Sequence, residues 1–210
     1  MSKPLSEIID PLPFEGTFSL SRIGSVSAEA ISQLGDSEKA ELEECSNLKR
    51  QQEFVSSRVA LKKMAKEMGE QQQFEILKDE LGQPYGRSSS QIYFVSIAHT
   101  NDSIFCGLTQ ADPIGVDLEP VDRTVPERLE QRITHPKEKE LITKMPAIQL
   151  WTIKEAYIKL RGKGLRMNMN EVQIGKESSR LFAELNDDKS AKICSFRLKN
   201  KWLAIAYYQK

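Results

Sequence analysis

The sequence predicts an α+β protein made of two α+β units that meet near residue 111. Segments with helical and strand patterns alternate in blocks, helix, strands, helices and strands again, which favours this fold class over an all-α or all-β fold. The length of 210 residues allows one large domain or two small ones. The hydrophobic content of 39% and the charged content of 29% are typical of globular proteins.

The first unit, residues 1–111, is predicted to begin with an irregular segment that contains prolines. A helical pattern then covers residues 37–68, with a break near Ser46 and a C-terminal cap at Gly69. Strand-like segments, separated by turn residues, follow at residues 74–77, 92–97 and 104–108.

The second unit, residues 112–210, is predicted to begin with a strand at residues 114–118. Helical patterns follow at residues 126–133, 136–143 and 147–161. The first two begin with proline, which suits a first helical position, and the third ends at Gly162. The remaining strand-like segments cover residues 172–174, 193–198 and 202–208.

Several classes of protein are disfavoured by composition. The longest uncharged run, Ser88 to Asn101, is shorter than the ~20 apolar residues of a membrane-spanning helix, so we expect no membrane span. The N-terminus has no apolar core of the signal-peptide type. Three cysteines, far apart in sequence, argue against a disulfide framework and for a reducing compartment, which we take to be the cytoplasm. The formal net charge of zero disfavours a nucleic-acid-binding protein.

Charge is unevenly distributed along the chain. Residues 1–111 carry a net charge of −5 and residues 112–210 a net charge of +5. Within the second unit, residues 151–166 hold five Lys and Arg side chains and a single acid, Glu155. Either this segment binds an anionic ligand or its lysines form a solvated helix face.

Two carboxylates share one face of the strand at residues 114–118. Side chains alternate along a strand, so Asp117 and Glu119 point to the same side. They repel each other unless a cation lies between them. The alternative is a half-solvated edge strand with an acidic outer face.

The helix at residues 147–161 is apolar on two sides. Leu150, Ile153 and Tyr157 lie on one side, and Trp151 and Ile158 lie on the other. A helix of this kind is buried on both sides, so Glu155 and Lys159 are expected in a confined setting. The alternative is an ordinary helical ion pair between these two residues.

Asp117, Glu119 and Glu155 together offer three hard oxygen ligands, and lysines lie close in sequence to the third. Mg²⁺ prefers oxygen ligands and is often completed by substrate phosphates. We therefore expect a Mg²⁺ site with a phosphate substrate, whose remaining charge Lys154, Lys159 and Lys163 would neutralise.

Five motifs resemble those of the 4′-phosphopantetheinyl transferase superfamily and occur in the order found in that family. The two specific motifs are WTIKEAYIK at 151–159, continued by GKGL at 162–165, and GVDLE at 115–119. The three weaker ones are KRQQEF at 49–54 with Arg58, GQP at 82–84 and SIAHT at 96–100. Gln83 stands where the family usually has a cation, and Ala98 where it usually has a hydroxyl.

The resemblance implies transfer of 4′-phosphopantetheine from coenzyme A to a serine of an apo acyl or peptidyl carrier protein, with release of adenosine 3′,5′-bisphosphate. The chain length resembles the longer surfactin-synthetase-activator type. That type implies a monomer of two pseudo-twofold-related α+β halves with the active site at their interface.

The resemblance also implies roles for individual residues. Asp117, Glu119 and Glu155 would bind Mg²⁺, Lys159 would steady the phosphate charge, and Glu155 or a metal-bound water would take the serine proton. The residues implied in coenzyme A binding are Lys49, Arg50, Arg58, Gln83, Pro84, His99, Lys154 and Lys163. Independently, Arg50 and Arg58 lie about 80° apart on one helix, close enough in direction to grip one anion.

A carrier-docking surface is predicted on the helix that follows the carboxylate strand. Val125, Leu129 and Ile133 recur every fourth residue, and Arg128 and Arg132 run beside them, with Arg123 just before. Carrier proteins of this kind usually present an acidic helix. The alternative is an ordinary amphipathic helix that packs its apolar side inward.

Two other functions stay open. A Mg²⁺-dependent nuclease also uses paired carboxylates with a nearby lysine, but it needs a basic groove. A carrier-binding module without catalysis is conceivable from Gln83 and Ala98, and the presence of all three carboxylates argues against it.

Overall fold

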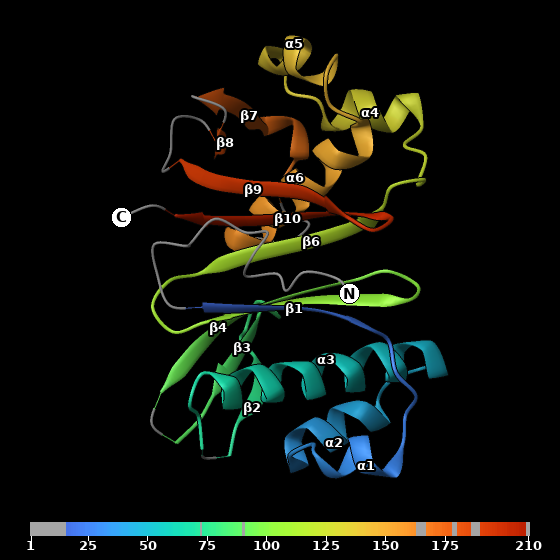
Figure 1. Ribbon diagram of the computed structural model, residues 1–210, viewed down its shortest axis with the longest axis vertical. Coiled ribbons are helices and arrows are strands. Elements are labelled where there is room, and N and C mark those ends of the chain that lie inside the picture. The colour runs from blue at the N-terminus through green and yellow to red at the C-terminus, as the bar shows by residue number, and fades with distance from the viewer. Residues whose placement is uncertain are drawn as a thin grey trace. The chain divides into compact units, whose positions relative to one another are not determined.

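The computed structural model describes residues 16–71, 73–89, 91–162, 167–177, 180–185 and 190–208. The chain divides into two compact units, Met1–Asp112 and Pro113–Lys210, one residue beyond the boundary expected from the sequence. Each unit joins a five-stranded antiparallel sheet to helices, which confirms the α+β class (Figure 1). In the part of the chain that is described, no helix is long and apolar enough to cross a bilayer.

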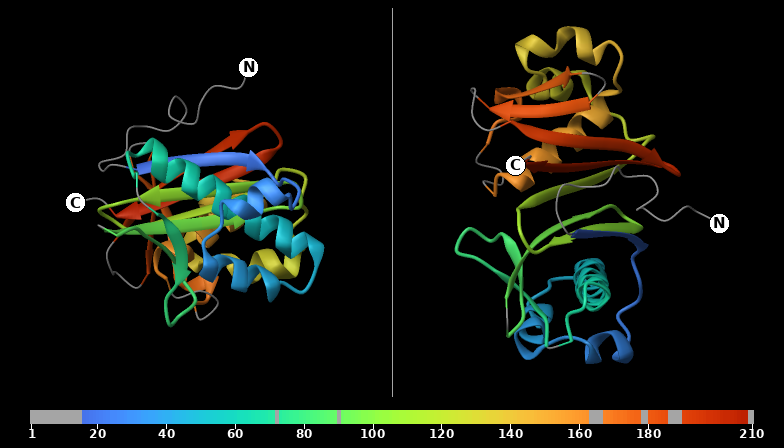
Figure 2. Two further views of the ribbon diagram at one scale, coloured as in Figure 1. Left: turned by 90° about the horizontal axis from the view of Figure 1, so that it is seen from below. Right: turned by 60° about the vertical axis from the view of Figure 1, so that its left-hand side comes forward.

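In the first unit, the longest helix lies against the sheet, and two short helices precede it (Figure 2). The elements are β1 (Gly16–Arg22), α1 (Ala28–Ser32), α2 (Asp36–Glu43), α3 (Leu48–Glu67), β2 (Glu75–Lys78), β3 (Pro84–Arg87), β4 (Ile92–His99) and β5 (Ser103–Thr109). The predicted break in the long helical region lies between α2 and α3, where the Asn47 side chain accepts a hydrogen bond from the Arg50 N–H as an N-cap.

In the second unit, the longest helix also packs on the sheet. The elements are β6 (Ile114–Pro120), α4 (Glu127–Ile133), the 3₁₀ turn η2 (Pro136–Glu138), α5 (Lys139–Ile142), α6 (Ala147–Leu160), the 3₁₀ turn η4 (Met169–Glu171), β7 (Val172–Glu177), β8 (Arg180–Leu185), β9 (Ala191–Leu198) and β10 (Lys201–Tyr208). As predicted, α6 ends before Gly162, which has a φ of 64°.

Both sheets have the same strand order. The first is β1-β5-β4-β3-β2 and the second is β6-β10-β9-β8-β7. In each unit the first strand is an edge, the last strand pairs with it, and helices connect the first strand to the second. The two halves therefore repeat one topology, although no repeat is evident in the sequence.

Three segments differ from the sequence-based prediction. Residues 16–22, expected to be irregular, form β1, which pairs along its whole length with β5. Residues 84–87, expected to be part of a turn, form β3, and β8 was not predicted. Each of these strands is defined by its partners across the sheet, and local residue pattern does not report such pairing.

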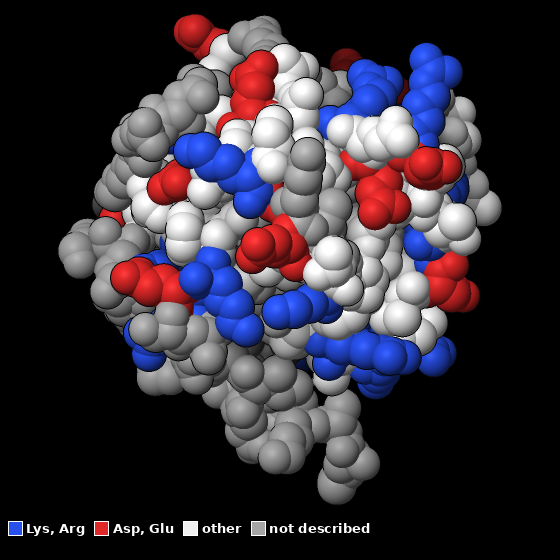
Figure 3. Space-filling view, turned by 90° about the horizontal axis from the view of Figure 1, so that it is seen from above, with Lys and Arg blue, Asp and Glu red and all other residues white. Residues whose placement is uncertain are grey.

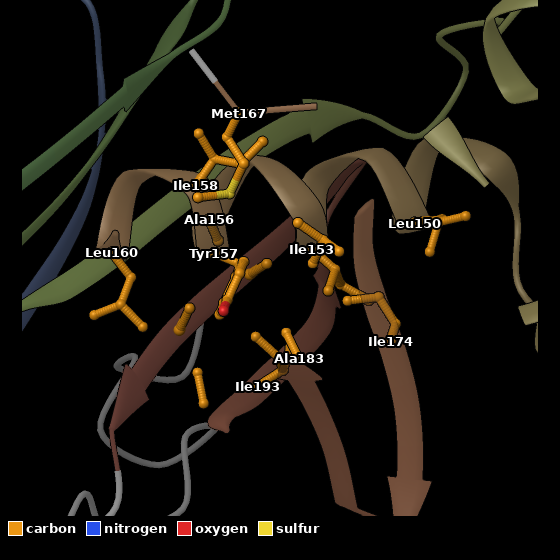
Figure 4. Close-up of a cluster of buried hydrophobic side chains, with 14 of the residues drawn as sticks. Leu150, Ile153, Ala156, Tyr157, Ile158, Leu160, Met167, Ile174, Ala183 and Ile193 are labelled. Carbon is orange, nitrogen blue, oxygen red and sulfur yellow. The ribbon is translucent and has the colours of Figure 1, made fainter. Parts of the chain in front are cut away.

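The core of the second unit forms where α6 covers the sheet. Ile153, Ala156 and Tyr157 from α6 are wholly buried and pack with Ile174 and Ala183 from the strands below (Figure 4). This packing fixes the rotation of α6 and therefore the direction of its remaining face.

A buried glutamate and lysine tie the helical layer of the first unit to its sheet. Glu38 is 1% exposed. Its carboxylate accepts hydrogen bonds from the backbone N–H groups of Gly35 (2.8 Å) and Ile76 (3.0 Å) and pairs with Lys62 Nζ at 2.8 Å. Lys62 also donates to the Phe74 carbonyl. We call Glu38 and Lys62 the N-terminal anchor.

The same arrangement recurs in the second unit. Glu138 accepts hydrogen bonds from the N–H groups of His135 (2.8 Å) and Ile174 (2.5 Å) and pairs with Lys154 Nζ at 2.8 Å. Lys154 also donates to the Val172 carbonyl at 2.7 Å. This C-terminal anchor, Glu138 and Lys154, joins α6 to the start of β7 in the way that Lys62 joins α3 to the start of β2.

Candidate active site

Strand β6 and helix α6 are unusually close, and Gly115 is the reason. A Cβ placed at Gly115 would lie 1.8 Å from the carbonyl oxygen of Ala156 and 2.5 Å from the backbone nitrogen of Leu160. A side chain there would collide with the helix backbone. Because side chains alternate along a strand, Asp117 and Glu119 share the face of Gly115 and are directed to the α6 side.

Helix α6 is buried on both sides, as the sequence predicts. Most of its side chains are buried, including Ile153 and Ile158, which lie on different sides. Trp151, Glu155 and Lys159 are only partly buried and follow one another at intervals of four residues. They form one partly open stripe along the helix, and this stripe carries Glu155 and Lys159.

Asp117 and Lys159 form the central contact of the site. Lys159 Nζ donates to Asp117 Oδ1 at 2.8 Å. The Asp117 side chain is 9% exposed, and its second oxygen, Oδ2, is buried without a hydrogen-bond partner among the described residues. Burial raises the pKa of Asp117 to about 7, while Lys159 lowers it and Glu155 and Glu119 raise it further.

Glu119 is held by a second cation. Arg123 Nη1 donates to Glu119 Oε1, and the Arg123 guanidinium lies over the Trp151 ring, 5.2 Å from its centroid. Burial also raises the pKa of Glu155; Lys159 and Arg123 oppose this rise and Glu119 adds to it. The three carboxylates are thus electrostatically coupled, as the strand and helix patterns predict.

The chemistry of these donors fits a divalent cation. An orphaned, buried carboxylate oxygen on Asp117 costs free energy that a metal ion would recover. As the side chains lie, however, no three His, Cys, Asp or Glu residues of the described ranges are gathered closely enough to hold a metal. Instead, Lys159 and Arg123 supply positive charge beside Asp117 and Glu119.

The prediction that Lys154 binds coenzyme A is wrong. Its side chain is 0% exposed, and its ammonium donates to Glu138 and to three backbone carbonyls, of Ile133, Met169 and Val172. An ammonium with four protein oxygens around it has no donor left for a phosphate. Lys154 is a structural residue of the C-terminal anchor.

Arg58 is likewise not available as a nucleotide contact. Its side chain is 5% exposed, pairs with Glu41 at 3.4 Å and lies over the Phe54 ring at 4.0 Å. Burial lowers the pKa of Arg58, and Glu41 partly offsets this effect. Arg50 is exposed. The proposed shared grip of Arg50 and Arg58 on one anion is therefore wrong, because one side chain points into the unit and the other into solvent.

Other predicted contacts gather at one end of α3. Lys49 Nζ donates to Asn101 Oδ1 at 2.7 Å, and His99 Nδ1 lies 3.4 Å from Glu53 Oε1. Glu53 also lies 3.9 Å from Lys49. The structure thus brings together two predicted coenzyme A contacts, Lys49 and His99, from motifs about fifty residues apart.

Gln83 and Pro84 lie at a separate turn. The Gln83 N–H donates to Asp79 Oδ1 at 2.8 Å, at the turn between β2 and β3, and Pro84 opens β3. Lys163, expected beside the phosphate, lies outside the described residues.

The predicted docking helix packs its apolar side inward. Ile133 is 2% exposed and Leu129 packs against the core of the second unit, so Leu129 is wrong as a docking anchor. Arg128 and Arg132 are exposed. Figure 3 shows one face of the molecule, seen from above, where cationic and acidic side chains are interspersed. The apolar pattern of α4 reflects core packing, and its arginines face solvent.

Arg123 and Trp151 were not assigned to the metal site from the sequence. Arg123 lies four residues after Glu119, and Trp151 lies four residues before Glu155. The four-residue spacing from Trp151 to Glu155 was a usable signal because both lie on α6. The Glu119–Arg123 contact crosses a turn, which has no fixed periodicity.

Comparisons with known proteins found a matching family model and two similar proteins. Residues 113–207 match the family model described as the 4′-phosphopantetheinyl transferase superfamily. The "4′-phosphopantetheinyl transferase gsp" of Aneurinibacillus migulanus is 30% identical over 111 residues, which cover 49% of this chain and 44% of that protein. The chain thus matches less than half the length of this curated relative. The crystal structure of Thermotoga maritima holo-[acyl-carrier-protein] synthase superposes with a TM-score of 0.40 and 23% identity, over 46% of this chain and 62% of that one.

Proposed function

We propose that this chain transfers 4′-phosphopantetheine from coenzyme A to a serine of an apo carrier protein, because residues 113–207 match the family model of the 4′-phosphopantetheinyl transferase superfamily. Adenosine 3′,5′-bisphosphate is the second product. The observation that carries this proposal is the contact of Asp117 with Lys159, flanked by Glu119 and Glu155, at the place where both specific motifs meet.

Negative charge on the pyrophosphate is the main obstacle to this reaction, and positive charge in the site would stabilise it. The serine oxygen forms a bond to the phosphorus next to pantetheine, and the bond from that phosphorus to the bridging oxygen breaks. Lys159 is half-buried, so its charge is less screened than at the surface. We place it next to the phosphates, where it stabilises charge that develops on the leaving group.

Glu155 takes the serine proton in this proposal. Burial raises its pKa, and a carboxylate with a raised pKa accepts a proton more readily than an exposed one. Asp117, Glu119 and Glu155 would hold Mg²⁺, which when bound neutralises pyrophosphate oxygens. In the first unit we retain Lys49, Arg50, His99, Gln83 and Pro84 as coenzyme A contacts.

Compartment and assembly are part of the same proposal. The three cysteines, Cys45, Cys106 and Cys194, are free thiols, which fits a reducing environment. We propose a cytoplasmic monomer.

Mass spectrometry of the carrier tests the function directly. The chain is incubated with coenzyme A, Mg²⁺ and apo carriers from fatty-acid, polyketide and peptide synthesis. We expect at least one carrier to gain the mass of one phosphopantetheine, and a carrier with its target serine replaced by alanine to gain none. Absence of the mass gain on every carrier, with folded protein and Mg²⁺ present, would overturn the proposal.

A further inference from the structure

Two carboxylates of the site are each paired with a cation from the chain itself, and the two pairs differ in exposure. In the pair of Lys159 with Asp117, the side chains are 31% and 9% exposed. In the pair of Arg123 with Glu119, they are 40% and 14% exposed. The Arg123 pair is thus the more open to water and the weaker one.

Arg123 has a second interaction partner, Trp151, in addition to Glu119. Its guanidinium carbon lies 5.2 Å from the centroid of the Trp151 ring, and an aromatic face attracts a cation with an energy similar to that of an exposed ion pair. Arg123 also acts on the charge of Glu155. It therefore interacts electrostatically with two of the three carboxylates proposed to bind the metal.

A divalent cation and the Arg123 guanidinium compete for Glu119. Mg²⁺ typically lies about 2.0–2.1 Å from its oxygen ligands. A guanidinium bound to the same carboxylate would therefore place two positive charges close together in a half-buried setting, where they repel each other. Among the described residues, Asp117 and Glu119 are already paired with Lys159 and Arg123.

We propose that Arg123 is an exchangeable counter-ion of the metal site. It holds Glu119 in the metal-free protein and leaves it when a divalent cation binds. This inference rests on the proposed function for the location of the metal, and it adds a positioning residue outside the five motifs.

Trp151 provides a readout that does not depend on catalysis. The chain has two tryptophans, so the Trp202→Phe variant leaves Trp151 as the only tryptophan, which is excited selectively over the tyrosines. Mg²⁺ is titrated into this variant without coenzyme A or carrier, and binding is measured in parallel by calorimetry. We expect the emission of Trp151 to change as the guanidinium moves, with the same midpoint as the binding isotherm.

Variants of Arg123 separate exchange from a general charge effect. In the Trp202→Phe background, Arg123→Gln should bind Mg²⁺ about 2- to 5-fold more tightly, as loss of one partly exposed ion pair implies, and its emission change should be lost. Arg123→Lys, which keeps the charge, should bind within twofold of the parent. Lys176→Gln removes one exposed positive charge from β7, at the opposite edge of the same sheet, and should also stay within twofold.

The outcomes distinguish this inference from the proposed function. If Mg²⁺ binds without changing Trp151 emission, or if Arg123→Gln binds it no more tightly than the parent, Arg123 is not an exchangeable counter-ion. Failure of the chain to bind Mg²⁺ at all would also overturn the exchange. A chain that binds Mg²⁺ with the expected exchange but modifies no carrier would overturn the proposed function and leave this inference standing.

Discussion

Burial and the Lys159 ammonium have opposite effects on the pKa of Asp117. Removing a carboxylate from water favours its protonated form, and this effect outweighs the nearby Lys159 ammonium, so the pKa of Asp117 rises to about 7. A structural carboxylate would more commonly be placed where its ionised form is stabilised. A cation that binds Asp117 during function would offset the free-energy cost of burying its ionised form.

The raised pKa of Asp117 predicts how stability depends on pH. A carboxyl group whose pKa is higher in the folded state favours folding when protonated. Its contribution is complete below the unfolded value of 3.8 and is lost as the pH rises through about 7. Between pH 4 and pH 8, metal-free protein should lose on the order of 3 kcal/mol from this group. Urea denaturation at a series of pH values measures the change.

The Asp117→Asn variant is the control for this pH dependence. Asparagine does not titrate, so the difference in unfolding free energy between variant and parent should change with pH over the same window. A difference that stays constant from pH 4 to pH 8 would show that Asp117 does not titrate there.

At the scale of elements, the two anchors hold each long helix to its sheet. Lys154 is fully buried against Glu138, and burial lowers the pKa of Lys154 while Glu138 opposes this. The equivalent pair in the first unit is Lys62 with Glu38. Lys154 directly precedes Glu155 in α6, so the anchor sets the rotation of the helix that carries the reactive side chains.

We predict that Lys154→Met destabilises the protein by about 3–5 kcal/mol, because Glu138 is left as a buried charge without its partner. Urea denaturation measures this loss. Coenzyme A affinity, measured by calorimetry where the variant is still folded, should stay close to that of the parent. Lys62→Met is the matched variant in the first unit and should also be strongly destabilising. Unchanged stability together with weaker coenzyme A binding would return Lys154 to the role of a ligand.

The close approach of β6 to α6 predicts a second effect at this scale. Gly115→Ala would place a methyl group 1.8 Å from the Ala156 carbonyl oxygen, so the helix must move away. We expect a loss of at least about 1–3 kcal/mol in stability, as for an overpacked core, and a slower transfer, because Lys159 would be displaced from Asp117. Denaturation and steady-state kinetics measure the two effects.

Gly24→Ala is the control for Gly115→Ala. The nearest atom to a Cβ at Gly24 is Ser56 Oγ at 3.8 Å, an ordinary contact. Stability and transfer should change little. Equal behaviour of the two variants would remove the close approach as the reason for glycine at position 115.

These elements also show what sequence can predict. Alternation along β6 and the apolar stripes of α6 were enough to predict that Asp117 and Glu155 interact electrostatically, because both patterns are local. The burial of Lys154 and Arg58 depends on Glu138 and Glu41, which belong to other elements. A cation on a helix has the same local pattern whether it binds a ligand or a buried acid, so sequence reasoning could not separate the two.

At the scale of the whole molecule, the two units share a topology and an anchor but differ in charge. The first unit carries the motif residues Lys49 and His99 around Glu53, whereas the second carries the coupled carboxylates. The two units therefore share one strand order but carry different functional side chains. The active chemistry of the proposed reaction belongs to the second unit, and the anchors are the part that both retain.

The carrier partner is the remaining question at this scale. Leu129 packs into the core, so any contribution of α4 to carrier docking must come from its exposed arginines, Arg128 and Arg132. Exposed charges act mainly on the rate of association and on its dependence on salt. We predict that reversing both to Glu lowers kcat/KM for an acidic carrier about 10-fold at low ionic strength, flattens its salt dependence and leaves the KM for coenzyme A unchanged.

A variant with the same change in net charge separates docking from bulk electrostatics. Lys63 and Lys66 are exposed on α3 in the first unit, and reversing both to Glu changes the total charge by the same amount. If the α4 arginines contact the carrier, the loss in kcat/KM should be several-fold larger for the α4 variant than for the α3 variant, and the difference should disappear as salt screens the charges. Equal losses would mean that the carrier responds to net charge alone, and no loss in the α4 variant at low salt would place the docking surface elsewhere. Because α4 follows directly from the strand that carries Asp117 and Glu119, a larger loss there would locate the incoming serine on the side of the second unit where the carboxylates lie.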